Sequence, residues 1–206
     1  MKVLPLFALS LIASLGSLDA EEDDALKKEL EDALTEEEIE RRGPEDSELI
    51  YARGAEEPFT GRLKFMHDNG KVHILTQCKN GKPDGELTVW HENGRRAQKT
   101  TKRDGVDHGL RTAWFENGQK SMEGRFDRGK PVGKHVEWHQ NGQMSSSIEH
   151  TDGLLHGRWT QWHPNGQKLM EGPCREGKMH GVFTEWNEEG QVVRKVRYVD
   201  GVPSEK

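Results

Sequence analysis

Histidine is the residue type in this sequence that could most readily form a metal site, because neutral imidazole is a common ligand of zinc and other transition metals. Ten histidines occur among 206 residues, and four of them recur in steps of 24 or 48 residues: His67, His91, His139 and His163. In a β-structure that adds two strands per recurrence, equivalent positions lie about 10 Å apart. One zinc ion binds its ligands at about 2 Å, so the spacing predicts structural histidines and no metal site.

The two cysteines, Cys78 and Cys174, occupy one position of the same pattern, four recurrences apart. On a regular array they are separated by about 40 Å, whereas a disulfide needs Cα atoms within about 7 Å of each other. We therefore expect no disulfide within one chain. Two interpretations stay open: small residues filling a position that Phe126 and Tyr198 also fill, or an intermolecular disulfide in an oxidising compartment.

Paired carboxylates would suggest acid–base catalysis, but the two that repeat are too far apart. Glu123 and Glu171 each stand in a Met-Glu-Gly triplet, two recurrences from one another. The sequence contains no G-x-S-x-G, H-E-x-x-H or phosphate-loop motif. It predicts a protein that is not an enzyme, with no catalytic residues, no metal and no cofactor.

Five tryptophans follow the same 24-residue period: Trp90, Trp114, Trp138, Trp162 and Trp186. Exposed, stacked aromatic rings bind sugar faces and choline-like cations. Here each unit supplies a single ring, in most units two residues after a threonine. This pattern favours the packed face of a sheet over a ligand site, although both interpretations remain open.

The elements that position these residues form a tandem array of 24-residue units, and three glycine positions define it. Together these positions take 18 of the 23 glycines. The first opens each unit, at Gly61, Gly85, Gly109, Gly133, Gly157 and Gly181. The second follows nine residues later, at Gly70, Gly94, Gly118, Gly142, Gly166 and Gly190, and the third at twenty. The predicted units are 61–84, 85–108, 109–132, 133–156, 157–180 and 181–206.

Each unit has the pattern of a β-hairpin. In the third unit, a strand rich in β-branched and aromatic residues begins at Gly109, and Asn117-Gly118 supplies a turn in which both residues tolerate positive φ. A return strand follows, and residues 128–132 turn back to Gly133. Two strands per unit predict an all-β fold: an elongated antiparallel meander, or ribbon, of six hairpin repeats without crossover helices, preceded by a short acidic helical segment.

Alternation along the first strand of each unit predicts the two faces of this sheet. The threonine and tryptophan positions, three and five residues into the unit, share one face, which we predict to be packed. The residues four positions into the unit point the other way and become polar toward the C-terminus: Val89, Ala113, Glu137, Gln161 and Glu185. This second face is predicted to meet water.

Three segments precede the array. Residues 1–20 combine a basic start, an apolar run over residues 3–13 and small residues at the exit, which predicts a secretory signal peptide and export to the periplasm or the extracellular space. Residues 21–48 carry 14 acidic and four basic side chains and predict an acidic helical or disordered tether, with a capping box at Thr35–Glu38. Residues 49–60 are predicted to be a degenerate half-repeat that caps the first unit.

The junctions between units carry a G-x-x-H-G motif at His108, His156 and His180. With the aromatic residue and the Asn-Gly turn that follow, this motif resembles MORN repeats and, more closely, the variant repeats of the bacterial YwqK-type family of antitoxin-like proteins. The resemblance covers residues 49–206 and implies a twisted antiparallel ribbon. It implies roles in membrane recognition, protein docking or neutralisation of a partner. Standard MORN units carry another glycine two residues after the motif, where this chain has Leu63, Leu87, Arg111, His135, Trp159 and Phe183.

The acidic charge is concentrated in residues 21–48, and the array has no basic face of the kind that nucleic-acid binding requires. Our preferred hypothesis is an exported scaffold that binds an unidentified protein partner through its extended β-surface. The alternative is an envelope module that binds cell-wall glycan or phospholipid headgroups of a membrane surface through the tryptophans. A third hypothesis is an antitoxin-like neutraliser of a partner protein.

Overall fold

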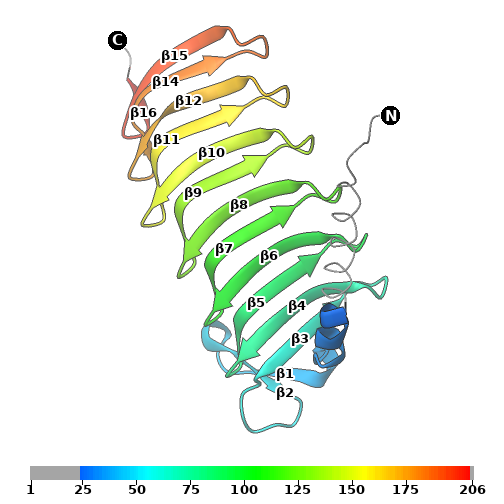
Figure 1. Ribbon diagram of the computed structural model, residues 1–206. Helices are drawn as coiled ribbons and strands as arrows, with labels where there is room; N and C mark the ends of the chain where they lie inside the picture. The colour runs from blue at the N-terminus through cyan, green and yellow to red at the C-terminus, as the bar shows by residue number, and fades with distance from the viewer. Residues whose placement is uncertain (1–23, 205–206) are drawn as a thin grey trace, which may run out of the picture.

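The computed structural model describes residues 24–204, which form one long antiparallel sheet with a short helix and a small second sheet at its N-terminal end (Figure 1). The predicted signal peptide lies outside the described residues. The strands of the main sheet are β3 (Gly61–Met66), β4 (Val72–Lys79), β5 (Lys82–Trp90), β6 (Arg96–Arg103), β7 (Val106–Trp114), β8 (Lys120–Asp127), β9 (Lys130–Trp138), β10 (Met144–Thr151), β11 (Leu154–Trp162), β12 (Lys168–Arg175), β13 (Lys178–Met179), β14 (Gly181–Trp186), β15 (Val192–Val199) and β16 (Val202–Ser204). The predicted all-β class is confirmed.

Each strand of the main sheet pairs antiparallel with the strands before and after it in the chain. Strands β13 and β14 together hold the place that a single strand has in the other units. The main sheet therefore grows by one hairpin at a time, and every unit contacts only its neighbours. This is the meander that the 24-residue period predicts.

Two kinds of turn alternate along the sheet, and they use glycine differently. At Asn69-Gly70, the amide of Gly70 donates to the carbonyl of His67 at 2.9 Å, and glycine alone has positive φ (77°). The other turn places both Asn80 (φ 49°) and Gly81 (φ 79°) in the left-handed region, as a two-residue hairpin turn requires. The predicted Asn-Gly turn is therefore present with positive φ at its glycine alone, and positive φ at both residues belongs to the second turn.

The strands also run further than predicted. The sequence predicts a turn over residues 128–132, whereas only Arg128 and Gly129 have positive φ before β9 begins. The glycine that opens each unit consequently lies inside a strand in the second to fifth units, and begins the strand in the first and the last. At Gly133, φ is 67° and the register between β8 and β9 shifts. The opening glycine thus forms a bulge, in a backbone conformation that a side chain would oppose.

The acidic segment before the array is folded against the first unit, and the predicted short acidic helix is confirmed at residues 24–31. It begins with this helix. Two single 3-10 turns follow, η1 (Glu36–Glu38) and η2 (Glu45–Ser47). The strands β1 (Ile39–Arg42) and β2 (Leu49–Ala52) pair as a hairpin. The predicted capping box is present at η1, where the amide of Thr35 donates to the carboxylate of Glu38 at 2.8 Å. This hydrogen bond holds the pKa of Glu38 below its usual value.

Residues 49–60 resemble a half-repeat only at their end. The amide of Gly81 donates to the carbonyl of Phe59 at 2.8 Å, as the amide of Gly105 does to the carbonyl of Pro83 one unit later. Strand β2, however, pairs with β1 and stays out of the main sheet. The half-repeat prediction is therefore correct for the entry into the first unit and wrong for the strand before it.

The outer edge of β3 is closed by the same N-terminal segment. The amide of Leu34 donates to the carbonyl of Arg62 at 2.9 Å, and the amide of Lys64 donates to the carbonyl of Leu34 at 2.8 Å. The helix is held beside this edge by an ion pair between Arg62 and Glu29 (2.9 Å) and by Lys64, whose Nζ donates to a helix carbonyl at 2.7 Å. Because an open sheet edge invites pairing with another chain, this closure leaves β3 unavailable to a further strand.

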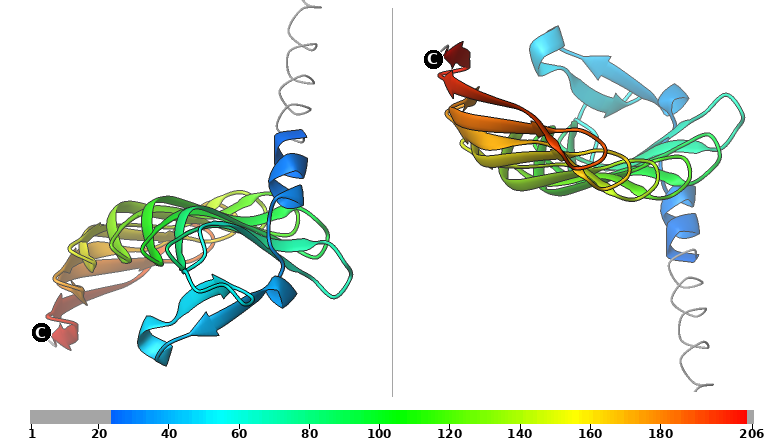
Figure 2. Two further views of the ribbon diagram at one scale, coloured as in Figure 1. Left: turned by 90° about the horizontal axis from the view of Figure 1, so that it is seen from below. Right: turned by 90° about the horizontal axis from the view of Figure 1, so that it is seen from above.

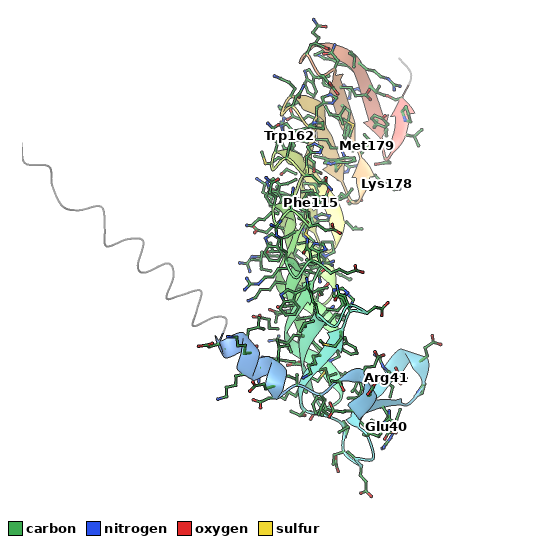
Figure 3. The ribbon with its side chains drawn as sticks, turned by 90° about the vertical axis from the view of Figure 1, so that its right-hand side faces the viewer. Glu40, Arg41, Phe115, Trp162, Lys178 and Met179 are labelled. Atoms are coloured by element: carbon green, nitrogen blue, oxygen red, sulfur yellow. The ribbon has the colours of Figure 1, made fainter. Side chains whose placement is uncertain are left out.

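The sheet bends along its strands and so has a concave and a convex face (Figure 2). The β1–β2 hairpin lies against the concave face, and the helix at residues 24–31 lies on the convex side (Figure 2). Figure 3 shows Trp162 on the side of the helix, and Met179 on the side of the hairpin that carries Arg41. The tryptophans at the repeated position therefore line the convex face.

The apolar core sits on the concave face, which corrects the prediction that the tryptophan face is packed. The two largest fully buried side chains are Leu63 and Phe183, each 1% exposed, both on the concave face. On the convex face the repeated tryptophans are half-buried, and the buried side chains are mainly threonines between the strands, as at Thr88, with Leu75 buried beside the helix. Bending explains the difference, because side chains on the inner side of a curve converge and cover one another, while those on the outer side diverge.

Candidate functional site

The repeated histidines at the first turn join one unit to the next. In every case Nε2 lies 2.8–3.0 Å from the carbonyl oxygen of the tryptophan in the following unit: His67 with Trp90, His91 with Trp114, His139 with Trp162 and His163 with Trp186. Within residues 24–204, no group of three histidine, cysteine or acidic side chains could hold a metal ion. The imidazoles therefore serve as links between units.

The Asn-Gly positions join the units in the same way. Oδ1 of Asn69 accepts from the amide of Lys71 at 3.0 Å, and Nδ2 donates to the carbonyl of Glu92 in the next unit at 3.1 Å. The same pair of bonds recurs at Asn93, Asn117, Asn141 and Asn165. The glycines that follow, Gly70, Gly94, Gly118, Gly142, Gly166 and Gly190, have φ between 77° and 88°. These predicted positions thus hold the turns in register.

The junction histidines lie in successive units, near the two-residue turns at one end of the strands, and are not brought together. Nδ1 of His108 lies 3.3 Å from Asp127, and Nδ1 of His180 lies 3.2 Å from Asp200. His156 is exposed. Each of these two contacts reaches into the following unit, so the residues connect neighbours and do not converge on a site.

The convex face pairs its own charges. Lys120 Nζ lies 6.0 Å from the ring centre of Trp138, and Lys168 Nζ lies 5.6 Å from that of Trp186. Both ammonium groups also contact the glutamate of a Met-Glu-Gly triplet, at 2.6 and 2.7 Å. The hydrogen bond from Lys168 lowers the pKa of Glu171, which also contacts Arg158 at 2.6 Å. The repeated tryptophans therefore lie among charged groups that satisfy one another.

On the concave face, the first unit is covered by the hairpin. Ile39 and Ile50 pack against Leu63 and Cys78 in one buried cluster. Beside this cluster, hairpin and sheet leave an open cavity of about 460 Å³, lined mainly by the apolar side chains of Ile50, Leu63, Phe65, Ile74, Pro83 and Leu87. Cavities of this size and character are the usual form of a binding site.

A second apolar cluster occupies the concave face of the last units. Ile148, Cys174 and Phe183 are buried there, and the half-buried side chains packed against them are Leu155, Trp159, Met170, Met179 and Tyr198. Among the described elements, no second hairpin lies over these units (Figure 1). No second layer of the described chain therefore covers these units, and Cys174 and Phe183 are buried by neighbouring side chains of the sheet itself.

Between the two clusters the concave face carries a half-buried charged network. Asp107 contacts Lys102 Nζ at 2.9 Å and Arg111 Nη1 at 3.4 Å. Arg111 also donates to Oε1 of Gln98 at 2.7 Å and lies over the ring of Phe126, with Cζ 5.8 Å from its centre. Two cations share one carboxylate, so the network carries one positive charge in excess.

Next to this network, two histidines pack against one another without hydrogen bonds to their buried nitrogens. The rings of His135 and His150 meet edge-on at 4.5 Å, and His135 also meets the ring of Phe126 at 5.2 Å. Nδ1 of both rings and Nε2 of His135 have no partner among the described residues. Burial lowers the pKa of both, and the charge of His135 lowers that of His150 further. Burial thus disfavours the charged form of both rings.

The two cysteines are free and lie in separate clusters of the concave face. Each is 4% exposed, and burial raises the pKa of Cys174 and raises that of Cys78 to about 11. They fill the position that Phe126 and Tyr198 occupy in other units, as predicted. A buried, protonated thiol is a poor partner for an intermolecular disulfide, so the structure disfavours that interpretation.

The importance of the concave face was not evident from the sequence, because the repeated tryptophans lie on the opposite face. The residues that dominate this face occupy the position at which the chain departs from standard MORN units, including His135 and Phe183. A second signal was available in Gly124 and Gly172, which fall outside the three repeated glycine positions. A Cβ atom at Gly124 would lie 1.9 Å from the His135 ring, and one at Gly172 would lie 2.3 Å from the Phe183 ring. These glycines therefore make room for the large side chain of the next unit.

Comparison with known families agrees with this architecture in the last two units. Residues 155–173 and 179–200 match the family model of the MORN repeat variant. MORN repeats are in general protein- or membrane-interaction modules, which is compatible with a repeat scaffold. A search of curated proteins finds no match to the chain. No helix among residues 24–204 has the length and apolar character to cross a membrane.

Proposed function

We propose that this protein is an exported, non-enzymatic scaffold whose concave face binds a protein partner. The observation that carries the proposal is the contrast between the faces. On the convex face Lys120, Arg158 and Lys168 pair with the glutamates beside them. The concave face combines an apolar cluster without a covering hairpin, an apolar cavity and an excess cation. Half-buried aromatic, methionine and arginine side chains are the types enriched in protein interfaces.

Export is the second part of the proposal and rests on the signal-peptide pattern of residues 1–20. Fractionation of cells that produce the full chain tests it. We expect the protein in the periplasm or medium, shortened at its N-terminus. Full-length protein confined to the cytosol would contradict this part alone.

Site-specific photo-crosslinking in the producing cells tests the docking face. Gln161 and Arg158 both lie on β11, the first on the concave face and the second on the convex face, so a photoreactive residue at each gives a matched pair. We expect Gln161 to give a protein adduct and Arg158 to give none. Adducts from Arg158 alone would overturn the proposed face.

The alternative function, binding of lipid headgroups or cell-wall glycan, draws support from one observation. The repeated tryptophans are half-buried, with lysines above two of the rings. Anionic vesicles or cell-wall fragments that shift tryptophan emission, and protect it from a soluble quencher, would favour this function. An antitoxin-like role would be a special case of docking in which the bound partner loses its activity.

A further inference from the structure

The concave face carries two features one unit apart that together specify a ligand. The first is the cavity between the β1–β2 hairpin and the sheet, with Leu87 in its floor. The second is the charged network that holds Arg111 on the next unit. Equivalent positions of neighbouring units lie about 10 Å apart, which an extended chain crosses in about three residues.

The cavity suits an apolar side chain. Its lining is apolar apart from Thr76 and three charged residues, Glu36, Arg41 and Glu48, of which the last two lie 3.5 Å apart. It continues the surface on which Ile39 and Ile50 of the hairpin already pack against Leu63. The chain's own hairpin therefore shows what this surface accepts, namely branched aliphatic side chains on extended backbone.

The network suits a carboxylate. Lys102 and Arg111 share Asp107, and their side chains are 21% and 31% exposed, so the excess positive charge is partly removed from water. Gln98 and Phe126 hold the Arg111 guanidinium in place, which reduces the ordering cost of binding an anion. A partner that adds one carboxylate would balance the two cations.

We propose that the concave face of the first three units binds an extended segment of a partner protein, in which an apolar side chain enters the cavity and an aspartate or glutamate, two to four residues away, pairs with Arg111 and Lys102. This inference rests on the proposed function and names the chemistry of its partner. The apolar side chain supplies the buried anchor, and the carboxylate fixes the register of the segment along the sheet.

Selection from a random 12-residue peptide library displayed on phage, with the full chain as target, tests this. We expect enrichment of peptides with an apolar residue and an acidic residue at the stated spacing. Their affinity should fall at least tenfold for Arg111→Glu and for Lys102→Glu, and for Leu87→Asp. Arg125→Glu, an exposed change on the convex side of β8, is the matched control and should leave affinity unchanged. Circular dichroism and urea unfolding check that each variant folds.

Selection on the Arg111→Glu variant sharpens the test, since the acidic preference should change to a basic one. Failure to enrich the apolar–acidic pair, or equal affinity for wild-type and both charge-reversal variants, would overturn the inference. The proposed function would survive that result if the photoreactive residue at Gln161 still captured a protein on the concave face, and it would fall with the inference if only the convex position did.

Discussion

The first and last units have the same backbone and differ in what covers them. In the first, Leu63 and Cys78 are covered by Ile39 and Ile50 of the hairpin. In the last two, Phe183 and Cys174 hold the equivalent positions and are surrounded by half-buried side chains of the sheet itself. Leu63 and Phe183 are equally buried, at 1% exposure, by these two different means.

This comparison shows how a single-layer sheet can form a core. At the N-terminal end the chain adds a second layer, as most domains do. At the other end a larger ring fits over a glycine of the preceding strand, and the bend brings its neighbours over it. The second solution leaves apolar side chains half-exposed, and we therefore regard the concave face of the last units as part of the docking surface.

Truncation of Leu63 and of Phe183 should distinguish burial under the hairpin from burial within the sheet. We expect Leu63→Ala to cost about 3 kcal/mol and Phe183→Ala about 4 kcal/mol of unfolding free energy, measured by urea unfolding. Because Leu63 also holds the hairpin, amide exchange over residues 39–52 should accelerate in Leu63→Ala alone. Equal exchange in both variants would show that the hairpin does not depend on this contact.

Filling the space that Gly172 leaves under the Phe183 ring should disrupt the packing of the last units. Gly172 is outside the positive-φ glycines, so Gly172→Ala acts by steric conflict with Phe183. We expect a loss of about 2 kcal/mol in urea unfolding. Phe183→Leu, which restores the residue type of the first two units, should recover most of this loss in the double variant. A stable Gly172→Ala single variant would contradict the proposed fit.

The buried histidine pair should make the middle of the concave face sensitive to acid. Burial lowers the pKa of His135 and His150 in the folded state, so the unfolded chain binds more protons once the pH falls below about 6.5. Stability from this pair is complete above that pH and is lost as the pH falls below it. We expect His135→Phe to weaken the pH dependence of the urea midpoint between pH 7 and 5, and His156→Phe, at an exposed position, to leave it unchanged.

The smallest effect concerns the two-residue turns. Glu176 has a φ of 52°, in a conformation that asparagine adopts more readily. We expect Glu176→Asn to raise the unfolding free energy by about 0.5 kcal/mol in urea unfolding. Asp152→Asn, at the equivalent turn, should change it by less, because aspartate already tolerates this conformation. A destabilised Glu176→Asn would mean that the side chain, and not the backbone, decides this position.

Much of the array could be predicted from the sequence because its determinants are local. The spacing of Gly61 and its equivalents gives the unit, and the Asn-Gly pairs mark one of its turns. The 24-residue period also sets the spacing of the repeated histidines. Each lies too far from the next to share a metal ion, but within reach of the tryptophan carbonyl of the following unit. The conformation of each turn was not predictable in the same way, because Asn-Gly is compatible with either kind.

The placement of the core and of the candidate site could not be predicted in this way. Alternation along a strand separates the two faces but does not say toward which of them the sheet will bend. Lys102 on β6 pairs directly with Asp107 on β7, but Arg111, further along β7, reaches the same carboxylate across a register shift that the strand pattern does not reveal. The packing of Ile39 and Ile50 on Leu63 depends on the path of a segment whose composition indicates only acidity.

The sequence by itself determined the repeat, the hairpins and the order of the strands, since each follows from residues within one 24-residue unit or from the contact between consecutive units. Only the tertiary structure decided which face is buried, how the N-terminal segment closes the first edge, and which side chains converge on the concave face. Those outcomes arise from the curvature of the whole sheet and from contacts between distant parts of the chain, which no single unit encodes.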